Sequence, residues 1–194
     1  MQLHETQHLV RSIFRGLPHL LLGGVPPERA GEKRLAFRRL AVEPRGDLQL
    51  TCDAFANGEP IPLRYTGDGG SAEPPLRFRG APRESRSLVL LVEDPDAPTP
   101  RPFVHWLVYG IPPSAIGIDA ARAGGARDGL SSLLKKGWVG CAPPKGDSAH
   151  RYFFQLFALN RAIDLPGGIG RSALLRALSG HVLSCATLIG TYRR

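Results

Sequence analysis

The chain has 194 residues, of which 42% are hydrophobic and 22% are charged, and it contains 23 glycines and 18 prolines. This composition is typical of one turn-rich globular domain, and it excludes a fibrous chain or one that is disordered throughout. The formal net charge of +8 favours anionic partners. However, no nucleic-acid-binding motif frames the scattered basic residues, so we expect a solvated arginine-rich surface and no specific nucleic-acid partner.

Several features bear on the compartment. No apolar run approaches the roughly eighteen residues that a spanning helix needs, so we expect no transmembrane segment. The apolar stretch from Leu17 to Val25 is interrupted by a proline and two glycines, and no convincing cleavage site follows it, so we expect no signal peptide. The three cysteines have no paired spacing, which argues against a disulfide framework and fits a reducing compartment. These observations predict a cytoplasmic location.

Residues 1–40 are predicted to be an N-terminal extension that is partly helical. Apolar side chains recur at helical spacing before Pro18, with arginines between them, which predicts a short amphipathic helix. They are Leu3, Val10, Ile13, Phe14 and Leu17. Glycine and proline pairs then break any regular structure. We expect the extension to pack on the domain or on a partner; a helix lying on a membrane surface is the alternative.

Residues 41–194 are predicted to form a domain of short strands separated by turn signals. Leu48, Leu50 and Cys52 alternate with polar residues, at the period of two that a half-buried strand shows. Ser87–Val92 (SLVLLV) is a continuous apolar run, which is typical of a strand buried on both faces.

The rest of the chain continues this pattern. Residues 104–109 and 152–159 are rich in aromatic and branched side chains and predict two more strands. Residues 171–179 place leucines on one face and are followed by Gly180, so they predict a helix. Residues 182–192 predict a final strand. Many short strands between Gly- and Pro-rich turns favour an all-β dominated fold, an antiparallel β-sandwich with a few peripheral helices.

Polar residues gather where the predicted strands begin or end. Prolines stiffen the loop after the first apolar run, so this loop can hold Asp94 in one orientation; a turn capped by Asp94 is the alternative. Strand alternation places Phe103 and His105 on one face of the next strand. Val104 and Trp106 would then share the opposite face.

Residues 140–152 have the composition of an anion-binding loop. Glycines let backbone N–H groups approach a ligand, prolines stiffen the loop, and His150 and Tyr152 alternate onto one face as the next strand begins. Backbone amides, an imidazole and a phenol can together hold a phosphate-sized anion.

The motifs, taken in order, resemble those of the phosphatidylethanolamine-binding protein family. Two signature blocks of that family are similar to residues 94–98 (DPDAP) with the following His105, and to residues 143–152 (PPKGDSAHRY). Residues 55–62 (FANGEPIP) and 180–192 resemble its bacterial, Raf-kinase-inhibitor-like branch.

The resemblance covers roughly residues 45–194 and implies a β-sandwich with a shallow anion pocket at one end. It implies a non-catalytic binding protein, without metal or cofactor, whose pocket accepts phosphate-like groups such as phospholipid headgroups. By matching motif, the residues that would line the pocket are Asp94, Ala97, Pro98, Phe103, His105, Ala142, Pro143, His150 and Tyr152. Phe103 stands where the family often has Trp, and Ala142 where it has Gly or another small residue.

The resemblance also bears on larger partners. Family members are associated with the regulation of a kinase or protease partner, and bacterial relatives are compatible with a homodimer. A protein partner would use the same cleft, which does not exclude ligand binding.

Two enzyme classes are alternatives. Cys141 lies near His150 in sequence, so a Cys/His-dependent hydrolase that uses Cys141 is conceivable, although the sequence has no Gly-x-Ser-x-Gly motif. His105, His150 and Asp94 are also the ligand set of a facial-triad metal enzyme. We favour the binding protein, because the ordered motifs agree with it.

Overall fold

The computed structural model describes residues 28–42, 44 and 46–194, so the helix predicted before Pro18 lies outside the described residues. Strands dominate the described chain. Its elements are η1 (Glu32–Arg34), α2 (Ala36–Arg39), β1 (Gln49–Cys52), η2 (Leu63–Tyr65), β2 (Leu76–Arg79), β3 (Ser87–Asp94), β4 (Phe103–Ile111), α3 (Ile118–Ala123), β5 (Arg127–Asp128), β6 (His150–Leu159), α4 (Arg171–Leu178) and β7 (Val182–Tyr192). In this part of the chain, no helix has the length and apolar character needed to cross a membrane.

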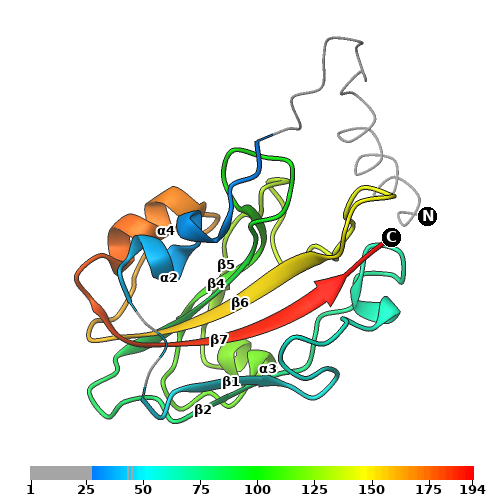
Figure 1. The fold of residues 1–194 in the computed structure, drawn as a ribbon. Helices are drawn as coiled ribbons and strands as arrows, with labels where there is room; N and C mark the ends of the chain where they lie inside the picture. The colour runs from blue at the N-terminus through cyan, green and yellow to red at the C-terminus, as the bar shows by residue number, and fades with distance from the viewer. Residues whose placement is uncertain (1–27, 43, 45) are drawn as a thin grey trace.

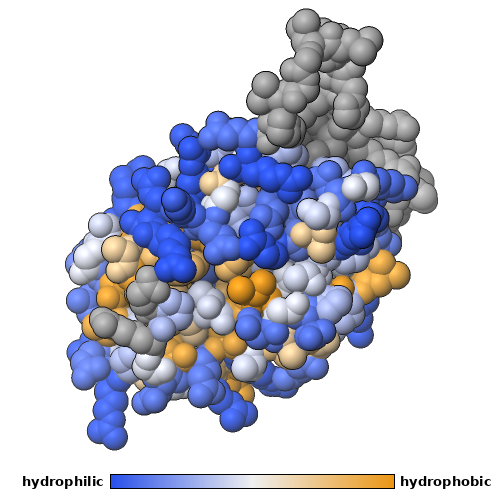
Figure 2. Space-filling view, viewed as in Figure 1, coloured by the Kyte–Doolittle hydropathy of each residue, from blue (hydrophilic) through white to orange (hydrophobic). Residues whose placement is uncertain are grey.

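The strands form two antiparallel sheets. The large sheet has the order β5-β4-β3-β6-β7, and β1 and β2 pair as a separate two-stranded sheet. The small sheet and α3 lie on one side of the large sheet, and α2 and α4 lie on the other (Figure 1). This arrangement confirms the predicted antiparallel β-sandwich with a few peripheral helices. Hydrophilic side chains cover most of the face shown in Figure 2, with smaller apolar areas between them.

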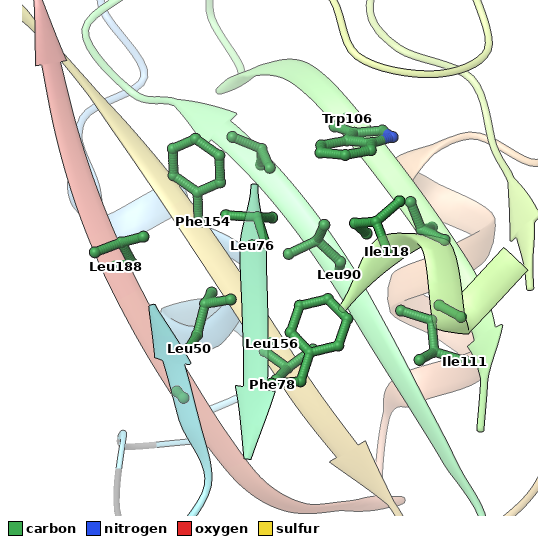
Figure 3. Packing of buried hydrophobic residues seen from close by; sticks show 14 of the residues in the cluster. Leu50, Leu76, Phe78, Leu90, Trp106, Ile111, Ile118, Phe154, Leu156 and Leu188 are labelled. Carbon is green, nitrogen blue, oxygen red and sulfur yellow. The ribbon is translucent and has the colours of Figure 1, made fainter. Parts of the chain in front are cut away.

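β3 supplies side chains to two separate cores. All of its residues are buried, as its continuous apolar sequence predicts. Because successive side chains of a strand point to opposite faces, Leu90 packs with Phe78 of the small sheet (Figure 3). The next residue, Leu91, belongs to the core that includes Phe37 of α2 and Leu174 of α4. The described part of the predicted N-terminal extension thus contributes to this second core. The predicted boundary between the extension and the domain, at residues 40 and 41, stays a prediction.

A buried carboxylate holds the helical layer on the large sheet. Glu93 of β3 is 0% exposed. Its Oε2 accepts hydrogen bonds from the backbone N–H of Ala36 and from the side-chain amide of Gln155, both at 2.8 Å. Its Oε1 forms an ion pair with Arg171, and Gln155 Oε1 in turn accepts from the backbone N–H of Phe37 at 3.0 Å. Since a buried charge is tolerated only when it is paired and hydrogen-bonded, this network joins β3 and β6 to α2 and α4.

Replacing Glu93 tests this network. We expect Glu93→Ala to lower the free energy of unfolding by about 3–5 kcal/mol, because the change leaves Arg171 and buried N–H donors without their acceptor. Urea unfolding measures the loss. The exposed Glu84 gives a matched control, and Glu84→Ala should shift the free energy by no more than about 0.5 kcal/mol. A loss for Glu93→Ala as small as that of the control would contradict the anchoring role.

Candidate functional site

Three motifs that are distant in sequence meet at one end of the large sheet. β3 lies between β4 and β6 and is antiparallel to both, so the end of β3 lies beside the starts of its two neighbours. Asp94 is the last residue of β3, Phe103 opens β4 and His150 opens β6. The topology therefore explains why these three residues come together.

A hollow opens at this end of the sheet, and we call it the pocket. Its empty volume is about 390 Å³, counted out to its open mouth. All nine residues predicted by the resemblance line it, together with four that the sequence analysis missed: Leu133, Val139, Gly140 and Pro144. Gly140 and Pro144 stand in the glycine- and proline-rich segment and could have been found there. Leu133 and Val139 carry no such signal.

Asp94 is a buried carboxylate that joins the two loops of the pocket. Its Oδ1 accepts hydrogen bonds from the backbone N–H groups of Asp96 and Ala97, at 2.7 and 3.0 Å. Its Oδ2 lies 2.8 Å from Nδ1 of His150. Asp94 therefore caps the turn through one oxygen and orients the imidazole of His150 through the other.

His150 is held in one orientation, with a carboxylate beside each ring nitrogen. Its side chain is 1% exposed. Burial lowers the pKa of His150, but the hydrogen bond to Asp94, the charge of Asp94 and the contact with Asp147 outweigh burial and raise the pKa above its ordinary value. Because the carboxylate of Asp94 accepts, Nδ1 carries a proton and Nε2 is the nitrogen left for a ligand.

A β-bulge in β4 gives His105 its place in the pocket. Val92 pairs with Trp106, and Glu93 pairs with Val104, so His105 is the extra residue on its strand. As a result, Trp106 joins the core under the small sheet, whereas Val104 joins the core under the helices. The prediction that Val104 and Trp106 share one face is therefore wrong, since strict alternation takes no account of an inserted residue.

His105 has the opposite electrostatic character to His150. Its ring centroid lies 4.8 Å from that of Phe103 and 5.0 Å from that of Tyr152. Its Nδ1 lies 2.7 Å from the carbonyl oxygen of Val139, which can only accept, so Nδ1 carries the proton. Burial lowers the pKa of His105 more than Asp94 and the carbonyl of Val139 raise it. The ring is therefore neutral near neutral pH, and its Nε2 is a hydrogen-bond acceptor.

The hydroxyl of Tyr152 is a buried donor without an oxygen or nitrogen partner among the described residues. Its polar neighbour is the Cys141 thiol, and a thiol is a weak hydrogen-bond partner. Burial raises the pKa of Tyr152 far above its ordinary value, and the nearby Cys141 and Asp94 raise it further. A buried polar group of this kind is uncommon and costly unless a ligand or water satisfies it.

Neither enzyme alternative finds support in this geometry. Cys141 is 0% exposed and belongs to the core under the small sheet, and burial raises the pKa of its thiol well above the ordinary value. Such a thiol is a poor nucleophile. A metal site with His105, His150 and Asp94 is not formed either: across residues 28–194, apart from the two that are not described, no group of three or more His, Cys, Asp or Glu side chains could hold a metal ion.

Comparison with known proteins gives consistent matches. A family model described as phosphatidylethanolamine-binding protein matches residues 51–193. The UPF0098 protein of Methanothermobacter thermautotrophicus is 42% identical over 153 residues, which cover 76% of this chain and 99% of that protein. The UPF0098 protein of Chlamydia trachomatis is 38% identical over 151 residues, with the same coverage of both chains.

Solved structures give the same result. A phosphatidylethanolamine-binding protein homologue from Chlamydia trachomatis superposes with a TM-score of 0.70 at 38% identity, covering 77% of this chain and 99% of that chain. YbcL of E. coli, described as a member of the mammalian family, superposes with a TM-score of 0.69 at 29% identity and the same coverage. All residues that line the pocket lie within the matched segment.

The two pocket histidines should titrate on opposite sides of the ordinary imidazole pKa of about 6.5. In an NMR titration of the ring protons, we expect the midpoint of His150 above this value and that of His105 below it, for the causes given above. Asp94→Asn should lower the midpoint of His150. Equal midpoints, or the reverse order, would contradict the assignment.

The two histidines change the stability of the fold with pH in opposite directions, so the pKa of each ring must be measured separately. Protonated His150 stabilises the fold fully below its unfolded pKa, and this stabilisation is lost as pH rises through the raised folded pKa. The lowered pKa of His105 acts in the opposite sense, because its stabilisation is present above the unfolded pKa and is lost as pH falls. The two effects oppose one another in the total stability, so a melting temperature would not separate them.

Proposed function

This chain belongs to the phosphatidylethanolamine-binding protein family, and we propose that it is a non-catalytic binding protein whose pocket takes a small phosphate-like anion. Membership supports a binding protein at the level of the family. The ligand class and the residues that bind it are our proposal.

The observation that carries the proposal is the buried pair of Asp94 and His150. Asp94 Oδ2 lies 2.8 Å from His150 Nδ1 and favours the protonated imidazole, which leaves the N–H at Nε2 as a donor for a ligand. Hydrogen bonds between a charged donor and an anion are shorter and stronger than neutral ones. A buried imidazole whose protonated form is favoured in this way is suited to an anion and poorly suited to a cation or an apolar ligand.

His105 and Tyr152 extend this preference to a protonated phosphate. Neutral His105 offers a hydrogen-bond acceptor at Nε2, and Tyr152 carries a hydroxyl with no oxygen or nitrogen partner among the described residues. A monoanionic phosphate or phosphomonoester carries both anionic oxygens, which accept hydrogen bonds, and a P–OH group, which donates one. Two donors and one acceptor in the pocket therefore complement this species.

We expect the affinity for simple phosphates to be weak. A small open pocket makes few contacts, and the ligand must still lose water and motional freedom on binding. A phospholipid headgroup shares the anionic oxygens of a free phosphate, but its phosphodiester has no P–OH group to donate to His105. Titration with inorganic phosphate, with the monoester phosphoethanolamine and with the diester glycerophosphoethanolamine separates the two sources. Regulation of a kinase or protease, a homodimer and a cytoplasmic location stay predictions.

Removing His150 tests the proposed function. We expect His150→Ala to weaken the binding of inorganic phosphate by roughly 1–3 kcal/mol, the value of a hydrogen bond to a charged group. Ligand-detected NMR or calorimetry at fixed ionic strength measures the change.

His181 provides the matched control. It follows α4 and contacts Asn160 and Arg161 at the opposite end of β6 from the pocket. His181→Ala should leave phosphate binding as it is in the unaltered chain. Equal affinities for the chain with and without His150 would refute the proposal.

A further inference from the structure

Arg29 contacts both loops beside the pocket, although it lies outside the segment that the family model matches. Its guanidinium donates to Oδ2 of Asp147 at 3.0 Å and to the backbone carbonyl of Asp96 at 2.7 Å. Asp96 belongs to the loop that follows β3, and Asp147 belongs to the loop that precedes β6. A backbone hydrogen bond of 3.0 Å from Gly31 N to Pro95 O holds the same segment in place. Arg29 therefore connects the two loops that form the walls of the pocket.

The same oxygen of Asp147 also lies against His150. Oδ2 is 3.4 Å from Nε2, the nitrogen that Asp94 leaves for a ligand. This distance is longer than the 2.7–3.2 Å or so of an ordinary N–H···O bond, so the donor is poorly satisfied. Asp147 thus places one carboxylate oxygen between the guanidinium of Arg29 and the imidazole of His150, which is where an anionic ligand would bind.

We propose that the carboxylate of Asp147 is an internal competitor that a bound phosphate group displaces, and that Arg29 then binds the phosphate beside His150. This proposal rests on the proposed function, since it assigns two further residues to the same pocket. Displacement is required because the carboxylate and a phosphate are both anionic and would compete for the same two donors.

The loop that carries Asp147 is suited to such a movement. The side chains of Arg29 and Asp147 are 40% and 30% exposed, so solvent screens their ion pair and weakens it. Asp147 ends a turn that is closed by a single backbone hydrogen bond of 3.3 Å to Pro144, and Gly146 within it has a φ of +89°. The carboxylate can therefore turn toward water without breaking a strand, and the bound phosphate would replace it as the partner of His150 Nε2.

Arg29 is the cation that a movement of Asp147 would release. Arg151 is engaged with Asp96 through two side-chain hydrogen bonds of 2.7 and 2.8 Å, and it also pairs with Glu32. Arg29 has Asp147 as its carboxylate partner, while its contact with the carbonyl of Asp96 would keep the guanidinium oriented. The planar guanidinium can offer two parallel N–H groups to a phosphate.

Asp147 is not needed to orient His150. Asp94 already holds the imidazole at 2.8 Å from a buried position, whereas the contact with Asp147 is longer and partly exposed. A competing carboxylate and a positioning carboxylate at Asp147 have opposite effects on the affinity for phosphate. A competitor weakens phosphate binding and a positioning residue strengthens it.

Phosphate titrations of the full chain therefore test the proposal. We expect Asp147→Asn to tighten the binding of inorganic phosphate about three- to tenfold, and Arg29→Gln to weaken it about tenfold, the size expected for one hydrogen bond to a charged group. When Arg29→Gln and Asp147→Asn are combined, the gain in phosphate affinity from Asp147→Asn should be smaller than in the single variant. The reason is that the arginine which Asp147→Asn would release is then absent. Circular dichroism establishes that each variant is folded.

Arg127 and Asp164 form a matched control pair. They make an exposed ion pair of 3.7 Å, and Arg127 pairs with Tyr109 near the end of β4 that is remote from the pocket. Arg127→Gln and Asp164→Asn should leave phosphate binding unchanged, which separates a local effect from a change in net charge.

The outcomes separate the two proposals. Absence of phosphate binding in the unaltered chain and in every variant overturns the proposed function. Binding that is lost in His150→Ala but is unchanged or weakened in Asp147→Asn overturns the competitor role of Asp147 and leaves the proposed function standing. Unchanged binding in Arg29→Gln overturns the role of Arg29.

Discussion

The hydrogen bond between Asp94 and His150 is the interaction on which the pocket depends. It joins residues that are 56 positions apart in sequence, at the end of one strand and the start of its neighbour. The buried carboxylate orients the imidazole, favours its protonated form and leaves Nε2 for a ligand. Without this pair, the hollow would offer a neutral acceptor and a phenol, but no preorganised imidazole N–H donor.

Neighbouring residues of β3 use the two faces of the sheet for different purposes. Glu93 points to the helices and holds α2 and α4 through a buried network, while Asp94 holds the pocket. The segment before β1 takes part in both, because Ala36 bonds to Glu93 and Arg29 bridges the two pocket loops. A segment outside the family match is thereby tied to the scaffold and to the two pocket loops.

Much of this arrangement could be predicted from the sequence. The continuous apolar sequence of β3 predicts a strand buried on both faces, and the ordered motifs around Asp94, His105 and His150 predict which residues line one pocket. The bulge at His105 could not be predicted, because an inserted residue has no signature in strict alternation. The contacts of Asp147 were equally hidden, since its partner Arg29 is 118 residues away and lies in a segment that the resemblance does not cover.

The most direct test of the central claim is a double-mutant cycle for phosphate binding with Asp94→Asn and His150→Ala. If Asp94 acts through His150, each single change weakens binding, and the double variant binds no more weakly than His150→Ala alone. Fully additive losses in the double variant would contradict the claim, because they would mean that the two residues contribute to binding independently.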